Sequence, residues 1–376
     1  MKNPGVEQWL SEVWSKLESK MSAECDRIGD RIPYIPEDGH YKVDMAEKDI
    51  YWWTNGFWPG MLWQMYGATG LEKYRLAAEG VELKLDAAFD GFEGLHHDVG
   101  FMWLHSAVAS YRLTGNARSK VRGIHAANLL AGRYNPRGKF IRAWNDDCTG
   151  WIIIDSMMNI PILYWASREQ NDPRFEYVAR DHADTVLNRA IREDGSSNHI
   201  VVLDPENGDF VEAPGGQGYA SGSSWSRGQS WALYGFALSY RHTKDERYLN
   251  AAKRIAHYFI ANVSVTGYVP LVDFRAPKSP VYWDTTAGVC AACGLLEIAE
   301  WVPELEKTFY TDSAIAILQN IDEKFCNWNS DEDSIVAGGV AAYHSRNGDF
   351  DVPILYGDYF FIEAITRLLG KHTLLW

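Results

Sequence analysis

Two aspartates stand where a carboxyl group could act on a substrate. Asp98 follows two histidines in "GLHHDVGF", directly before a stretch of helical periodicity. Asp155 follows three isoleucines in "WIIIDSMMNIPILYW", and we expect it to lie inside an apolar helix with little access to water. A buried carboxyl without a partner is costly to ionise, so its pKa should rise. Asp155 is therefore a candidate general acid near neutral pH, unless a neighbouring Ser or His satisfies it structurally.

Asp98 alone has a plainer interpretation. An aspartate just before a helix commonly caps it, accepting hydrogen bonds from the first free backbone N–H groups. The same interpretation applies to Asp284 and Asp358, which open later apolar segments.

A metal site is the competing hypothesis for His96, His97 and Asp98. Adjacent histidines on an extended segment point in opposite directions, and the sequence has no H-E-x-x-H motif or second paired cluster to supply further ligands. We therefore expect no metal and no cofactor.

The elements that position these residues repeat along the chain. An apolar helix, a short loop rich in Gly, Asn and Asp, and a second helix with one apolar face recur from Trp53, His96, Trp151, Trp225 and Trp283. A sixth pair is completed by joining the C-terminal "YGDYFFIEAITRLLG" to the N-terminal "VEQWLSEVWSKLESKM". Six inner and six outer helices predict an all-α (α/α)6 barrel, a six-hairpin toroid, as a single domain over residues 1–376. An open solenoid fits less well, because polar capping repeats are not evident.

The longer connections should hold short β-structure and open onto the first residues of the inner helices. "NHIVVLDPENGDFVEAP" predicts a hairpin around Pro205–Asp209, and "GYVPLVDF" predicts a further short strand. Asp98 and Asp155 begin adjacent inner helices in this scheme, so they could face each other across a pocket. Two carboxyls in one pocket are the usual requirement for glycoside cleavage.

The same rim gathers flat aromatic rings beside polar donors, which is what sugar binding needs. The aromatic and donor residues at the starts of the inner helices include Trp53, His97, Gln217, Trp225, Arg227 and Trp231. The glycine-rich "GGQGYASGSSWSRGQSW" lacks the Gly-Lys-Ser/Thr ending of a phosphate loop.

Composition narrows the partners and the compartment. The net charge of −14 argues against nucleic acid and acidic membranes, and no apolar run is long enough to span a membrane. The N-terminal "MKNPGVEQWLSEVWSKLESK" does not resemble a signal peptide, and five scattered cysteines suggest no disulfide framework. Cys290 and Cys293 should be core residues. We expect a cytoplasmic protein, monomeric or weakly homo-oligomeric.

Six motifs together carry a family resemblance: "HHDVGF", "WIIIDSMMNIPILYWA", "DPENG", "GSSWSRGQSWALYGFAL", "CGLLEIA" and "YGDYFFIEAI". They resemble, in this order, the unsaturated glucuronyl hydrolases of glycoside hydrolase family 88. The resemblance implies an (α/α)6 barrel that acts without a metal on oligosaccharides left by polysaccharide lyases. Such substrates carry a 4-deoxy-uronate with a C4=C5 double bond, and the family releases this sugar by hydrating the vinyl ether.

The resemblance also implies roles for particular residues. Asp155 would be the general acid and base, and Asp98 would be the partner carboxylate that positions the sugar and keeps Asp155 protonated. The matched substrate-binding positions are His97, His199, Gln217, Arg227, Trp53, Trp144, Trp225, Trp231 and Tyr343. Relatives active on sulfated disaccharides carry a Ser/Lys-rich stretch where this chain reads "YHSRNGDFDVPILYGD". Ser345 and Arg346 could contact a sulfate there, but the lysine is missing.

Three alternatives are kept. An unsaturated rhamnogalacturonyl hydrolase would share the fold and the chemistry with a different leaving sugar. An inverting glycosidase on the same toroid would cleave saturated oligosaccharides. A carbohydrate-binding protein without catalysis would use the aromatic platforms alone, but the buried Asp155 would then be an unneeded cost.

Overall fold

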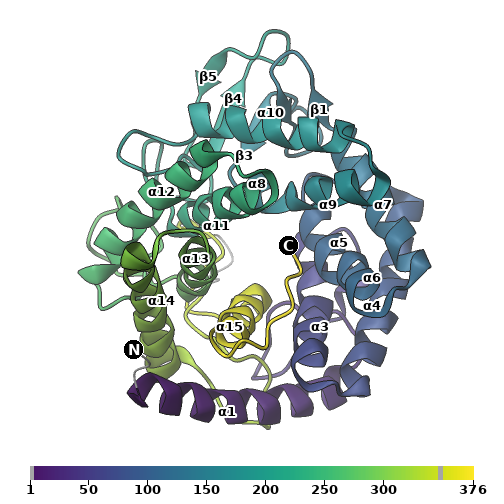
Figure 1. Cartoon of the computed structure of the whole chain (residues 1–376), viewed down its shortest axis with the longest axis vertical. Helices are drawn as coiled ribbons and strands as arrows, with labels where there is room; N and C mark the ends of the chain where they lie inside the picture. The colour runs from purple at the N-terminus through teal and green to yellow at the C-terminus, as the bar shows by residue number, and fades with distance from the viewer. Residues whose placement is uncertain (1–3, 346–349) are drawn as a thin grey trace.

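Six inner helical segments and six outer helices form a closed ring in the computed structural model, which describes residues 4–345 and 350–376 (Figure 1). The inner segments are α3 (Phe57–Thr69), α5 (Val99–Trp103) continuing through η2 (Leu104–Val108) into α6 (Ala109–Thr114), α8 (Ser156–Asn159) with α9 (Pro161–Gln170), α11 (Ser226–Thr243), α13 (Thr285–Ala299) and α15 (Leu355–Leu368). The outer helices are α4 (Glu72–Gly91), α7 (Ala117–Ala131), α10 (Arg174–Arg189), α12 (Glu246–Ser264), α14 (Glu304–Phe325) and α1 (Pro4–Ile28). The predicted (α/α)6 barrel is confirmed.

The two layers differ in how their residues are buried. Every residue of α13 is buried, Cys290 and Cys293 included, because this inner helix packs against neighbours on all sides. The outer helix α12 instead buries its one apolar face and exposes its polar face, as its periodicity predicts. The apolar interior of the ring therefore lies between and inside the inner helices.

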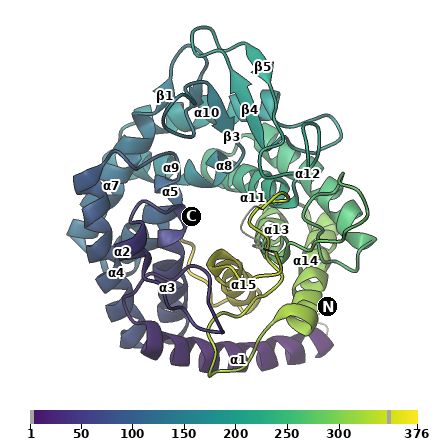
Figure 2. The ribbon, with the colours of Figure 1, turned by 180° about the vertical axis from the view of Figure 1, so that it is seen from behind.

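The ring closes as the sequence predicts, through the two ends of the chain. Helix α1 contacts α15, and it lies between α14 and α3 around the outside of the ring in both views (Figures 1 and 2). The C-terminal segment turns inward, and Trp376 is fully buried inside the ring. Its ring stacks on Phe360 of α15 at a centroid distance of 6.0 Å.

Short strands gather at one edge of the ring, beside α10 (Figure 2). Strands β4 (Ile200–Leu203) and β5 (Phe210–Glu212) form the predicted antiparallel hairpin. A second hairpin, which the sequence did not suggest to us, joins β1 (Tyr134–Asn135) to β2 (Phe140–Ile141). "GYVPLVDF" forms only isolated bridges, Trp225 with Asp273 and Leu271 with Trp283, so the expected strand was wrong.

The isoleucine run before Asp155 is the main correction to the predicted elements. Trp151–Ile153 is strand β3, which pairs antiparallel with β4, and helix α8 begins only at Ser156. A short apolar run is compatible with a buried strand or a buried helix, and here the cross-strand partner decided the outcome. Asp155 therefore lies in the turn between β3 and α8, not inside a helix.

Two smaller predictions have different outcomes. Asp284 caps α13 by accepting from the backbone N–H of Ala287, as expected. Asp358 lies within α15 and accepts instead from the backbone N–H groups of Ile335 and Val336. No helix in the described ranges is long and apolar enough to cross a membrane. The remaining short helices are η1 (Trp53–Gly56) and α2 (Met45–Lys48).

Candidate active site

Asp155 lies at the inner end of strand β3, where the chain turns into α8. Its side chain is 17% exposed, and Oδ1 has no hydrogen-bond partner among the described residues. Burial, and then the negative charge of Asp98, raise the pKa of Asp155 to about 8, while the nearby Arg227 lowers it. A carboxyl with this pKa carries a proton at neutral pH and can donate it.

Asp98 occupies the position before α5 but does not cap that helix. Its side chain bonds none of the first backbone N–H groups of α5, all of which lie in the described part of the chain. Asn159, the last residue of α8, takes over the capping role: its Oδ1 accepts from the N–H of Phe101 at 2.7 Å. The cap interpretation of Asp98 was therefore wrong, and its carboxyl is left for other contacts.

Asn159 also links the two aspartates. Its Nδ2 donates to Oδ1 of Asp98 at 2.8 Å and to the main-chain carbonyl of Asp155 at 3.2 Å. Burial raises the pKa of Asp98 to about 7, and the hydrogen bond from Asn159 is the largest opposing effect. Sequence reasoning missed Asn159, although its spacing of one helical turn from Asp155 is a usable signal.

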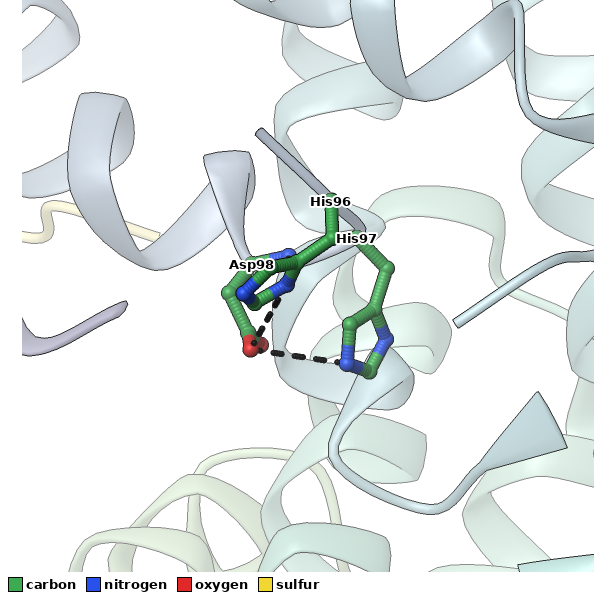
Figure 3. A group of neighbouring side chains, drawn as sticks. All are labelled: His96, His97 and Asp98. Carbon is green, nitrogen blue, oxygen red and sulfur yellow. Dashed lines mark hydrogen bonds and ion pairs between the residues drawn. The ribbon is translucent and has the colours of Figure 1, made fainter. Parts of the chain in front are cut away.

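The two histidines both face Asp98, as Figure 3 shows. Nδ1 of His96 lies 3.3 Å from Oδ2 of Asp98, and Nε2 of His97 lies 3.5 Å from the same oxygen. The expectation that the rings point in opposite directions was wrong, because the chain turns at His97 and is not extended there. Burial lowers the pKa of His96 to about 4 and that of His97 also falls, so both rings are neutral at pH 7.

This arrangement has the donor set of a three-ligand metal site. Nitrogen atoms of both histidines and an Asp98 oxygen lie within 4.8 Å of one another, and neutral imidazoles with a carboxylate are typical zinc ligands. The same geometry also suits a carboxylate held between neutral rings. Removal of metal ions distinguishes these two interpretations, as discussed below.

His199 is the histidine that lies beside Asp155. Its Nδ1 accepts from the backbone N–H of Gln217 at 2.9 Å, so in the neutral ring the proton is on Nε2, 3.8 Å from Oδ1 of Asp155. Burial lowers the pKa of His199 to about 3, so the ring is a neutral donor near neutral pH. The structure thus brings the predicted His97 and His199 to the two aspartates.

Arg227 and Gln217, which were predicted to contact the substrate, have hydrogen-bond partners within the protein. Arg227 is buried, and its guanidinium donates to Asp284 at 2.8 Å and to the carbonyls of Val340 and Ala341. Gln217 Nε2 donates to the same Ala341 carbonyl at 2.7 Å. Both side chains hold the loop that leads to Tyr343, and the buried Nε of Arg227 has no partner among the described residues.

The predicted aromatic residues lie at different depths. Trp144 and Trp53 are partly exposed, with Trp144 beside Trp151 and Trp53 beside Tyr356. Trp225 is almost fully buried and packs on His199 at a centroid distance of 4.5 Å.

Trp231 and Tyr343 are the remaining predicted aromatic contacts. Trp231 is fully buried against Phe101 and Phe360, so it lies beneath the site and presents no face to a sugar. Tyr343 is 8% exposed and contacts Tyr219 at a centroid distance of 5.0 Å. Ser345 follows it, and Arg346 lies outside the described residues.

A closed ring of helical hairpins, two adjacent carboxyls with raised pKa values and aromatic rings at the rim define a carbohydrate-active hydrolase. Residues 26–242 match the model of Glycosyl Hydrolase Family 88. The chain is 36% identical to the unsaturated glucuronyl hydrolase of Bacillus sp. strain GL1, over 91% of this chain and 92% of that protein. It is 33% identical to an unsaturated chondroitin disaccharide hydrolase of Streptococcus pneumoniae, over 86% and 83% of the two chains.

The fold comparison agrees with these matches. The crystal structure of the Bacillus sp. GL1 unsaturated glucuronyl hydrolase, described as responsible for the degradation of glycosaminoglycan, superposes with a TM-score of 0.89 at 33% identity, covering 96% of each chain. The chain therefore belongs to glycosyl hydrolase family 88 and is a glycoside hydrolase.

Proposed function

We propose that this enzyme releases a 4,5-unsaturated uronate from the non-reducing end of lyase-generated oligosaccharides, as in glycosaminoglycan degradation. The observation that carries the proposal is the Asp98–Asp155 pair, in which burial and a neighbouring carboxylate keep a proton on Asp155. Like charges in one buried site do not both ionise readily, so one carboxyl acts as an acid and the other stays a carboxylate.

The reaction begins with proton transfer from Asp155 to C4 of the unsaturated sugar. The C4=C5 electrons form the new C4–H bond, and positive charge develops on C5 and the ring oxygen. The Asp98 carboxylate stabilises this oxocarbenium-like charge. The ionised Asp155 then takes a proton from a water molecule as the water oxygen bonds to C5.

The resulting C5 hemiketal opens to a ketone, and the ring oxygen remains on C1 as a hydroxyl. C1 then carries this hydroxyl and the leaving sugar, and it collapses to an aldehyde as the leaving sugar departs as an alcohol. The net change is the addition of one water molecule. Asp155 returns to its protonated state, and no electron donor or acceptor is needed.

The neutral histidines suit this sequence of steps. His199 presents Nε2–H beside Asp155 and, with its low pKa, does not exchange protons in place of Asp155 near neutral pH. His97 lies beside Asp98 and can donate to its carboxylate. Trp53 and Trp144 offer partly exposed rings for stacking against sugars.

The whole chain, residues 1–376, acts as one catalytic domain in this proposal, because the ring needs α1 to close beside α15. It works in the cytoplasm as a monomer or weak homo-oligomer, without a metal or other cofactor. Five unpaired cysteines in the described ranges fit a reducing compartment.

The test is a substrate panel. Unsaturated disaccharides from chondroitin, hyaluronan, heparin, gellan and rhamnogalacturonan are mixed with the purified protein, and the ultraviolet absorbance of the conjugated double bond is followed. The proposal requires loss of absorbance on at least one of the glucuronate-type substrates. Loss on the rhamnogalacturonan disaccharide alone would assign the enzyme to the alternative leaving sugar, and no loss on any substrate would contradict the proposal.

A further inference from the structure

A cavity of about 650 Å³ lies beside His96, at the ends of two outer helices. The C-terminal ends of α4 and α7, the β1–β2 hairpin and the loop after β2 form its walls; the residues that matter to its chemistry are Glu93, His96, Arg133, Arg137, Arg142 and Asn145. His96 belongs to this wall, and its Nδ1 lies 3.3 Å from Oδ2 of Asp98, so one side chain separates the cavity from Asp98.

Three arginines of this wall form no ion pair with any carboxylate of the described residues. Arg133 donates to main-chain carbonyls, among them those of Leu95 and Trp144, and to Oδ1 of Asn145. Arg142 donates only to the carbonyl of Asp146, and its buried Nε has no partner within the described ranges. In a chain with 50 acidic and 36 basic residues, three guanidinium groups without an ion pair at one cavity favour an anion there. Every N–H group of Arg133 already donates to a protein oxygen, so Arg133 contributes positive charge, and the donors for an anion come from Arg137 and Arg142.

The pKa of Arg133 also reflects the excess of positive charge in this wall. Burial, and then the positive charge of Arg142, lower the pKa of Arg133 to about 10, while the negative charge of Asp98 raises it. Glu93 is the single acidic residue among the described residues that line the cavity. Positive charge in this wall is therefore not neutralised locally.

A second cavity of about 280 Å³ continues the basic surface on the other side of the hairpin. Arg137 lines both cavities, and Lys139 and Arg189 line the second, whose described lining residues include no carboxylate. Lys139 has one ion pair, with Asp181 at 3.5 Å. The hairpin thus carries a row of basic residues that begins near His96, the neighbour of Asp98, and a linear polyanion can follow such a row.

We propose that the Arg133–Arg137–Arg142 cavity binds a sulfate or carboxylate group on a sugar unit beyond the one that reacts. This inference rests on the proposed function, because it takes the ligand to be an anionic oligosaccharide. Guanidinium groups suit both anions, since their planar fork donates two parallel hydrogen bonds to a sulfate or a carboxylate. The site gives a net-negative enzyme a local affinity for polyanionic substrates.

The test measures binding first, so that it does not depend on turnover. Calorimetry on an Asp155→Asn background compares Arg137→Ala, the double variant with Arg142→Ala, and Arg118→Ala as the control. Arg118 lies at the other end of α7 and is 74% exposed, so its removal subtracts the same charge without touching the cavity. The ligands are a saturated sulfated tetrasaccharide, its desulfated form, and inorganic sulfate at the same concentration.

We expect the Arg137 and double variants to weaken binding of the sulfated tetrasaccharide by about tenfold or more, with Arg118→Ala unchanged. A loss confined to the sulfated ligand assigns the site to sulfate, and a loss on both saccharides assigns it to carboxylate. Equal binding in all variants, or inorganic sulfate binding as tightly as the saccharide, would overturn the proposal. Because Arg137 is exposed on the hairpin, Arg137→Ala should fold normally.

A kinetic measurement separates this site from the reaction itself. In the enzyme that keeps Asp155, Arg137→Ala should raise KM for a sulfated unsaturated substrate about tenfold and leave kcat unchanged. For an unsulfated disaccharide, neither KM nor kcat should change. An enzyme inactive on every substrate that still shows the arginine-dependent binding would refute the proposed function and leave the anion site standing.

Discussion

Asp155 and Asp98 have opposite requirements for a proton, and this sets the expected pH dependence. Asp155 must be protonated to act as the acid, so activity should fall as pH rises through about 8. Asp98 must be ionised to stabilise positive charge, so activity should also fall as pH drops through about 7. The result is a narrow bell-shaped profile of kcat, measured from about pH 5 to about pH 10.

Asp98→Asn is the informative companion to this profile. It removes the negative charge that raises the pKa of Asp155, so the alkaline limb of the residual activity should move to lower pH. His199, with a pKa near 3, should add no limb in this range. A rate that keeps rising to about pH 10 would be incompatible with Asp155 as the acid.

The buried carboxyl of Asp155 should also cost stability. Its pKa is raised from 3.8 to about 8 on folding, so the native state holds a proton that the unfolded chain releases as pH rises between these values. Asp155→Asn avoids this cost and loses no hydrogen bond at Oδ1 that the described residues provide. We expect it to raise Tm by a few degrees at about pH 8 and by almost nothing at about pH 4.

Asp284→Asn is the matched control for the stability measurement. Asp284 is buried but paired with Arg227 at 2.8 Å, so the same chemical change leaves a buried cation without its partner and should lower Tm. Thermal unfolding followed by circular dichroism at both pH values distinguishes the two effects. A lower Tm of Asp155→Asn at about pH 8 would instead mean that the ionised carboxyl has a stabilising partner.

Removal of metal ions tests the role of His96, His97 and Asp98. If Asp98 acts as a carboxylate held between neutral rings, dialysis against EDTA should leave kcat and KM unchanged. The geometry of His96, His97 and Asp98 would also suit zinc, so this measurement decides between the two interpretations. Loss of activity with EDTA, restored by adding zinc, would replace the two-carboxyl mechanism with a metal-assisted one.

At the scale of elements, the close contact between α5 and α8 sets the distance between the two aspartates. A Cβ atom on Gly100 of α5 would lie 2.4 Å from the main chain of Asn159. Gly100→Ala should therefore push α5 away from α8, break the hydrogen bond from Asn159 to Asp98 and lower kcat by about tenfold or more.

Gly132→Ala is the control for this change. Gly132 follows α7 with a negative φ, and an added Cβ would lie 3.3 Å from its nearest neighbour, so kcat on an unsulfated disaccharide should be kept. Steady-state kinetics and the far-ultraviolet circular dichroism of both variants make the comparison. Near-full activity in a folded Gly100→Ala variant would mean that this contact does not position the catalytic pair.

The same elements show what a single sequence can and cannot predict. The repeated apolar and one-sided helices predicted the barrel, because layered burial leaves a periodic pattern. The isoleucines before Asp155 were assigned to a helix because a short apolar run does not reveal its cross-strand partner, β4. Asn159 was missed because its role depends on a contact with α5, which is far away in the sequence.

Site chemistry was predictable in kind more than in detail. Asp98, Asp155, His97 and His199 come together as expected, because they stand at the starts or rim loops of neighbouring inner segments. The hydrogen bonds that the Arg227 guanidinium donates within the protein could not be predicted, because the accepting carbonyls of Val340 and Ala341 belong to a loop more than a hundred residues away.

At the scale of the whole molecule, the closed ring explains how a chain of −14 net charge can hold reactive carboxyls. The inner segments and their connections bury most of Asp98 and Asp155, and burial is the largest cause of both raised pKa values. Both ends of the chain contribute to this enclosure. Trp376 is fully buried inside the ring. Lys20 of α1 donates to the carbonyls of Asn329 and Glu332.

In the proposed reaction the enzyme protonates C4 and hydrates the double bond, in place of displacing the leaving group at the anomeric carbon. This reaction is tested most directly by running the reaction of an unsaturated disaccharide in D2O and examining the earliest product by mass spectrometry and NMR. We expect each released sugar to be matched by loss of ultraviolet absorbance and by one deuterium at C4. The Asp155→Asn variant should release no sugar and leave the absorbance unchanged. Release of the leaving sugar with the C4=C5 double bond intact and no deuterium at C4 would contradict the proposed reaction.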